Sequence, residues 1–214
     1  MNKIFQLFIE QMVNGFIDEM AISSSQAEES GLALVIYPRN EDVDIILFKP
    51  EVFKEEYQPY TMKVIHHMDS KSVVGAIFLE PREQCNSWVV GASAAEKGYG
   101  PLLYDIAFSY AGNTGLSSDR SSVSPSAKNI WKHNFTTRRD EFDIDYHTNP
   151  KCLSRSGEEY LDYKYTLKSP INYNSLLQKG NQCMEELLQK NMAPKPIHVL
   201  DTMASNFFAQ KYAG

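Results

Sequence analysis

Two glycines flank a tyrosine at Gly98-Tyr99-Gly100, between an apolar run at residues 88–92 and a longer one at residues 102–111. We expect a strand and then a helix from these two runs, because the first is short and the second is long and almost wholly apolar. A helix that begins directly after such a loop leaves its first N–H groups unpaired at the positive end of its dipole. The segment therefore predicts a phosphate-binding loop, and the alternative is a plain tight turn.

A second polar segment follows the predicted helix. It starts with a short predicted strand at residues 116–118, which ends at Asp119. Ser124 and Pro125 then form a favourable helix start, since a serine side chain can cap the first turn and proline suits the first helical position. The helix that they begin carries Trp131.

The two segments together resemble the GNAT family of N-acetyltransferases. That family has a phosphate-binding loop of pattern Arg/Gln-x-x-Gly-x-Gly/Ala after its fourth strand, then a helix, a splayed fifth strand and another helix. Residues 95–100 match both glycines, with Ala95 in place of Arg or Gln. In the second segment Ala127 and Ile130 match, while Ser124 and Trp131 stand where the family usually has Asn and Tyr. The resemblance covers residues 61–135 and is greatest to phage-encoded acetyltransferase-like proteins.

The resemblance implies that acetyl-coenzyme A is the co-substrate. Backbone amides within residues 97–103 would hold its pyrophosphate, except at Pro101, which has no N–H. The cofactor-binding residues that the resemblance implies are Val90, Gly91, Lys97, Gly98, Tyr99, Gly100, Leu102, Leu103 and Trp131.

The resemblance also implies acetyl transfer by direct attack of an amine, on a small molecule or a protein, in a ternary complex. A strand N–H, from Val90 or Gly91, would polarise the thioester carbonyl. The indole N–H of Trp131 cannot protonate the leaving thiolate, so the expected donors are Ser124, Tyr104, Tyr99 or a water.

Asp119 is our first choice of general base, because it ends the strand that the resemblance splays from its neighbour. Glu80, His66 and His67 are the other candidates. Asp119 has a structural alternative as a member of an ion pair or a turn.

Two other functions remain open. A GNAT-like protein that has lost catalysis can act by binding a partner protein through its added helices, and Trp131 and Ala95 favour this reading. An unrelated phosphate-binding α/β protein would have no affinity for coenzyme A.

Composition narrows the class of protein. The chain has 214 residues, 43% of them apolar, and a formal net charge of -6, which disfavours nucleic acid as a partner. Asn14 and Asp18, among other polar residues, interrupt the apolar N-terminal segment, so we expect no membrane partner. Its three cysteines are widely separated and form no CxxC pair, so we expect neither a metal site nor a disulfide. We therefore expect the protein in the cytoplasm, which is the host cytoplasm if a phage encodes the chain.

Periodicity predicts the order of elements. We expect helices at residues 3–20, 102–111, from 125, 171–190 and 199–212, and strands at 32–37, 43–48, 61–68, 72–79, 88–92, 116–118 and 160–167. The expected fold is α/β (α+β): a GNAT fold with a mixed, mostly antiparallel sheet of six to seven strands, flanked by helices. We divide the chain into an N-terminal amphipathic helix (1–29), a GNAT-like domain (30–168) and a helical C-terminal extension (169–214). Oligomeric state is not predicted.

Overall fold

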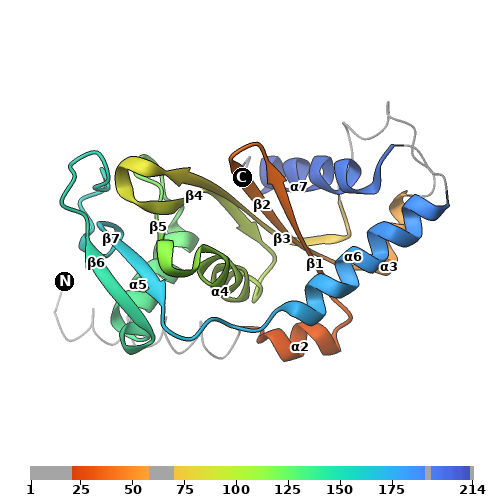
Figure 1. The fold of residues 1–214 in the computed structure, drawn as a ribbon, viewed down its shortest axis with the longest axis horizontal. Helices are drawn as coiled ribbons and strands as arrows, with labels where there is room; N and C mark the ends of the chain where they lie inside the picture. Colours follow the sequence, from red (N-terminus) through yellow and green to blue (C-terminus); the bar gives the residue numbers. More distant parts are fainter. Residues whose placement is uncertain (1–20, 58–69, 191–193, 213–214) are drawn as a thin grey trace.

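A mixed sheet organises the molecule (Figure 1). The computed structural model describes residues 21–57, 70–190 and 194–212. Within them the sheet has seven strands in the order β1-β2-β3-β4-β5-β7-β6, and every neighbouring pair is antiparallel except β4 with β5. The strands are β1 (Ala33–Arg39), β2 (Asp42–Phe48), β3 (Val73–Arg82), β4 (Ser87–Ala95), β5 (Leu116–Ser117), β6 (Phe142–Tyr146) and β7 (Tyr163–Leu167). The predicted mixed, mostly antiparallel sheet is confirmed, while the predicted helix at 3–20 and strand at 61–68 lie outside the described residues.

Helices cover both faces of the sheet. One face carries α2 (Ser24–Glu29), α4 (Gly100–Ala111) and α5 (Pro125–Thr136), and the other carries α3 (Pro50–Tyr57) and α7 (Pro196–Tyr212). Strand β2 shows the division, because Ile45 and Leu47 join the α4 core while Ile46 and Phe48 join the α7 core. A strand buried on both faces reads as a continuous apolar run, which explains residues 45–48.

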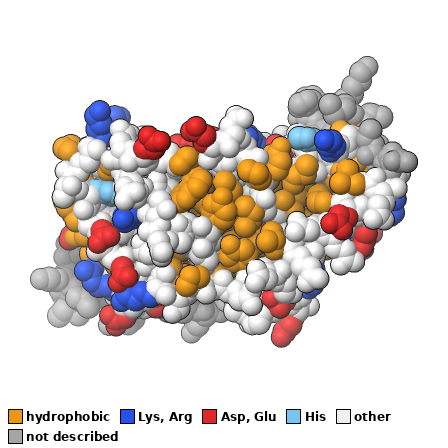
Figure 2. All heavy atoms as spheres, in the orientation of Figure 1, with side chains coloured by type: hydrophobic (Ala, Val, Ile, Leu, Met, Phe, Trp, Pro, Cys, Tyr) orange, Lys and Arg blue, Asp and Glu red, His pale blue; other side chains and the backbone are white. Residues whose placement is uncertain are grey.

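Helix α4 is apolar along most of its length. In the view of Figure 2, hydrophobic side chains gather over the middle of the molecule, with charged side chains mostly toward its margins. The helix itself buries Leu103, Ile106 and Phe108, among others, against the sheet. A helix this apolar is stable only when it is buried, and its packing on the sheet determines where its N-terminus lies.

Helix α6 (Asn174–Gln189) closes the β1 edge of the sheet. It places Leu176 in the α4 core and Leu187 in the α7 core, so it bridges the two faces. Gly180 lies at the crossing, where an added Cβ would overlap the main-chain carbonyl of Leu34. The absence of a side chain at Gly180 therefore lets the helix backbone pack directly on the edge strand.

Strands β4 and β5 pair over a very short distance. Their parallel register contains Trp88 with Leu116 and Val89 with Ser117, and β4 then continues to Ala95 without β5. The chain after β5 turns away toward α5. The far half of β4 is thus paired with β3 on one side and lacks a neighbouring strand on the other.

The expectation of no disulfide is wrong, because Cys85 and Cys152 are bonded to each other. They are 67 residues apart in the sequence, and only the fold brings the turn between β3 and β4 beside the loop after β6. Asn149 joins the same two segments, since its side-chain amide donates to the carbonyl of Gln84 (3.0 Å). Cysteine spacing therefore gives no argument for a reducing compartment. None of the described helices is long and apolar enough to span a bilayer.

Replacing Gly180 with alanine should destabilise the protein. The new Cβ would force α6 away from β1, and we expect the free energy of unfolding to fall by about 3 kcal/mol or more. Urea denaturation measures this change. Asn181→Ala, at the next and exposed position of α6, should change it by no more than about 0.5 kcal/mol, and equal effects of the two substitutions would contradict the close approach.

Loss of the disulfide should also be measurable. We expect Cys152→Ser to lower the free energy of unfolding by about 2–5 kcal/mol. The variant cannot form the disulfide, so its unfolded chain is no longer constrained by a long cross-link. Reductant should bring the wild-type denaturation midpoint to that of the variant. A wild-type midpoint that does not respond to reductant would show that the two thiols are not bonded.

Candidate functional site

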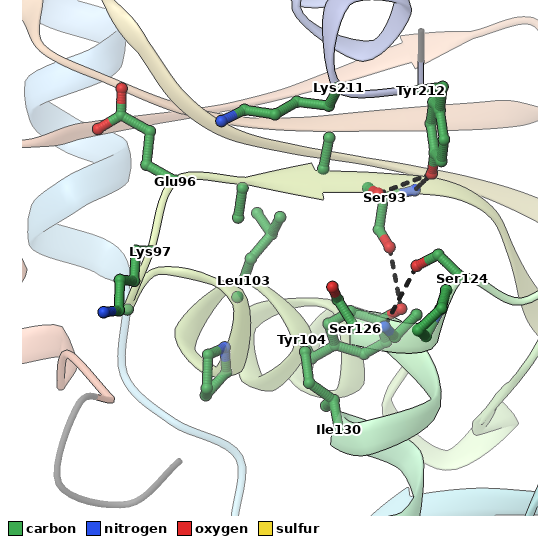
Figure 3. Close-up of a pocket in the computed structure, with 17 residues that line it drawn as sticks. Ser93, Glu96, Lys97, Leu103, Tyr104, Ser124, Ser126, Ile130, Lys211 and Tyr212 are labelled. Atoms are coloured by element: carbon green, nitrogen blue, oxygen red, sulfur yellow. Dashed lines mark hydrogen bonds between the residues drawn. The ribbon is translucent and has the colours of Figure 1, made fainter. Parts of the chain in front are cut away.

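A cavity opens where β4 loses its second neighbour. Its volume is about 450 Å³, and its walls come from the far half of β4, the N-termini of α4 and α5, and the last turn of α7 (Figure 3). The side chains and backbone that line it belong to Ser93, Ala94, Ala95, Glu96, Lys97, Gly98, Gly100, Pro101, Leu103, Tyr104, Ser124, Pro125, Ser126, Ala127, Ile130, Lys211 and Tyr212. A smaller gap of about 20 Å³ adjoins it and shares Ser93, Tyr104, Ser124, Ala127 and Tyr212 with it.

The first wall is the loop at the start of α4. Gly98 has a φ of 91°, a conformation that favours glycine, and its carbonyl accepts the N–H of Ile22 (3.1 Å). The amides of Tyr99 and Leu103 are already used, since they donate to Glu96 (3.2 Å) and to the Tyr99 carbonyl (3.0 Å). These two amides are therefore not available to a ligand.

Some donors in this loop do remain available. Within the described part of the chain, the N–H groups of Gly98, Gly100 and Leu102 have no hydrogen-bond partner. Tyr99, the residue before the helix, adds no side-chain cap. The first turn of α4 thus presents unpaired donors, with the positive end of the helix dipole behind them.

The second wall is the start of α5. The Ser124 hydroxyl accepts the N–H of Ala127 (3.2 Å), and Pro125 occupies the first helical position, as the sequence predicts. Ser124, Ser126 and Ala127 all line the cavity. Two helix N-termini therefore converge on one cavity, which makes it suited to a ligand that carries negative charge.

The third wall is the open edge of β4. Main-chain groups of Ser93 point away from β3 at this edge, because both its N–H and its carbonyl contact the Tyr212 hydroxyl. Earlier in the strand the register with β3 shifts, since Val90 pairs with Leu79 and Ala92 with Phe78, which leaves Gly91 as an extra residue. A bulge of this kind locally disrupts the ladder and bends the strand. Val90 and Gly91 border the smaller gap.

Tyr104 forms the floor of the main cavity, and Trp131 lies beneath it. The Tyr104 hydroxyl lies 3.0 Å from Ser93 Oγ, and burial raises the pKa of this phenol to about 12. Trp131, only 1% exposed, packs edge-on against Tyr104 and against Phe108. It borders the smaller gap and not the main cavity, so it supports the floor from below.

Asp119 acts as a turn cap. Its Oδ2 accepts hydrogen bonds from the Ser121 hydroxyl (2.9 Å) and the Ser122 N–H (3.1 Å), and its Oδ1 lies 3.9 Å from the Arg82 guanidinium. It borders the smaller gap. The contacts of Asp119 are thus those of the structural alternative, a turn residue with a neighbouring ion pair.

Glu80 lines neither the cavity nor the gap, but it lies next to the bulge in β4. Its Oε1 lies 3.1 Å from the point where a side chain of Gly91 would begin, so the carboxylate sits beside the bulge in β4. The side chain of Glu80 is 38% exposed, whereas that of Asp119 is 14% exposed. The Arg82 guanidinium lies 3.6 Å from Glu80 Oε2. His66 and His67 lie outside the described residues.

The remaining predicted residues divide between the two spaces. Lys97, Gly98, Gly100, Leu103, Tyr104 and Ser124 line the main cavity, and Val90, Gly91, Asp119 and Trp131 border the gap. Tyr99 and Leu102 line neither space, although the N–H of Leu102 is unpaired.

Sequence reasoning missed Ser93, Lys211 and Tyr212. The last two lie on a helix more than a hundred residues downstream of β4, and no motif marks them. Where the structure describes the chain, it contains no cluster of three or more His, Cys, Asp or Glu side chains that could hold a metal ion.

No family model, curated protein or solved structure matches this chain.

Proposed function

We propose that this chain is a GNAT-type N-acetyltransferase, which binds acetyl-coenzyme A along β4 and transfers the acetyl group to an amine. The observation that carries the proposal is the convergence of two helix N-termini beside the unpaired half of β4. The order of β4, loop, α4, β5 and α5, and the early parting of β4 from β5, agree with what the family resemblance implies.

The residues present fit the coenzyme. A diphosphate needs several N–H donors and positive potential, and the unpaired amides of Gly98 and Gly100, which line the cavity, supply both at the start of α4. The amide-containing arm of the coenzyme needs main-chain partners, and the free edge of β4 offers them as a neighbouring strand would. The cavity volume of about 450 Å³ lies in the range of ligand pockets.

Acetyl-coenzyme A supplies an acetyl group activated as a thioester. The protein must take a proton from the acceptor ammonium, orient the free amine toward the carbonyl carbon, and stabilise charge on the carbonyl oxygen as the C–N bond forms and the C–S bond breaks. We assign the proton acceptor to Glu80, in preference to Asp119, because Asp119 already caps a turn. The N–H of Val90 or Gly91, which border the smaller gap at the bulge in β4, would polarise the carbonyl oxygen.

The Ser93 and Tyr104 hydroxyls form the proton donor pair for the leaving thiolate. They are 3.0 Å apart, and the raised pKa of Tyr104 keeps it protonated across the physiological range. Ser93 lines the main cavity and can relay the proton.

A second candidate is a coenzyme A-binding protein without catalysis. The burial of Trp131 favours it, because the residue that stands where the family has its tyrosine is packed into the core and has no acidic hydroxyl. Both candidates require coenzyme binding, and only the first requires turnover.

Binding of the coenzyme should raise the melting temperature. Acetyl-coenzyme A at about 100 times its dissociation constant should stabilise the wild-type protein by about 2.7 kcal/mol, as measured by thermal shift. Gly98→Asp should lose this shift through a side-chain clash and charge repulsion. Gly31→Asp is the matched control, since Gly31 also has a positive φ (74°) but does not line the cavity. No shift of the wild type with either acetyl-coenzyme A or coenzyme A would remove both candidates.

Turnover should depend on Glu80. With an amine acceptor found by thiol-release screening, Glu80→Gln should lower kcat by about 10²–10⁴-fold at neutral pH while coenzyme affinity is retained. Glu83→Gln, an exposed carboxylate nearby, should leave kcat unchanged. Equal rates for Glu80→Gln and the wild type would exclude Glu80 as the base, and background rates with every amine would favour the binding protein.

A further inference from the structure

The last turn of helix α7 borders the cavity through Lys211 and Tyr212. Helix α7 packs on the sheet through Val199, Leu200, Met203 and Phe207, all buried. Its last turn extends past this contact and places Tyr212 over the far half of β4, as Figure 3 shows. Tyr212 lines both the main cavity and the smaller gap.

The Tyr212 hydroxyl satisfies both main-chain groups of Ser93. It accepts the Ser93 N–H at 3.1 Å and donates to the Ser93 carbonyl at 2.7 Å. A neighbouring strand would fill the same two positions with an N–H and a carbonyl of its own. One phenol therefore takes the place of one peptide-like unit on the open edge of β4.

The contact is made by an exposed side chain. Tyr212 is 54% exposed, so little apolar burial accompanies its two hydrogen bonds. Such bonds each change an equilibrium constant by only about two- to tenfold. The last turn of α7 can therefore leave β4 at low cost, whereas the buried part of the helix stays in place.

We propose that Tyr212 is a gating residue, which competes with the amide-bearing arm of the coenzyme for Ser93 and must leave β4 before that arm can bind. The inference rests on coenzyme binding in this groove and does not require catalysis. The apparent affinity of the wild type is then lowered by the fraction of molecules in which Tyr212 occupies the edge. Any partner that holds the end of α7 against β4, or away from it, would set the affinity for coenzyme A.

Calorimetric titration with coenzyme A tests the gate. Tyr212→Phe removes the competing hydroxyl and should lower the dissociation constant by about three- to tenfold. Tyr212→Ala also removes the ring and should lower it at least as far. Tyr146→Phe is the matched control, because Tyr146 is similarly exposed (52%) but lies on β6 away from the cavity lining, and it should bind as the wild type does.

The outcomes separate the gate from the site. Tighter binding by both Tyr212 variants supports the gate, including the case in which only the variants bind. If the wild type binds coenzyme A and the two Tyr212 variants bind it equally well or more weakly, the gate is overturned and the coenzyme site stands. No binding by any of the four proteins overturns the coenzyme site and the gate with it.

Hydrogen exchange gives an independent readout. Saturating coenzyme A should slow exchange at the Ser93 amide and speed it in the last turn of α7, because the ligand replaces Tyr212. Slower exchange in both segments would mean that α7 closes over the ligand, and the gate would be wrong.

Discussion

The arrangement of the candidate site depends on one constraint, the loss of a neighbour along β4. After Val89 the strand keeps its partner β3 but has no β5 beside it. Main-chain groups at such an edge must find other partners, because unpaired buried N–H and carbonyl groups cost free energy. In this protein the cavity opens along that edge, and a tyrosine hydroxyl takes the place of the missing strand at Ser93.

Packing on the α4 face keeps the edge open. Trp131, Tyr104 and Phe108 contact one another beneath the gap. These contacts join α5 to α4 and leave the open edge of β4 uncovered. This aromatic cluster directs both helix N-termini toward the same cavity. The burial of Trp131 in this cluster thus also positions the N–H donors at the start of each helix.

Local parts of the fold were predictable from sequence. The short link between residues 32–37 and 43–48 indicates the β1–β2 hairpin, whose turn contains Asn40 at positive φ. Ser124 and Pro125 mark the start of α5, and two glycines mark the β4–α4 loop. Each of these signals acts within a few residues of chain. The roles of individual groups were less predictable, because the amides of Tyr99 and Leu103 and the carboxylate of Asp119 are used in local hydrogen bonds that residue type alone does not reveal.

By itself the sequence determined most of the elements and the glycine loop before α4, since hydrophobic periodicity, caps and glycine act locally. It did not indicate α2, α3 or β6, which are short and become ordered only against the rest of the fold. The tertiary structure decided which distant residues meet. It bonded Cys85 to Cys152, set Glu80 beside Gly91, and placed Tyr212 on Ser93, 119 residues away. These contacts follow from the packing of helices and strands whose mutual positions depend on the whole core, so no spacing along the chain can indicate them.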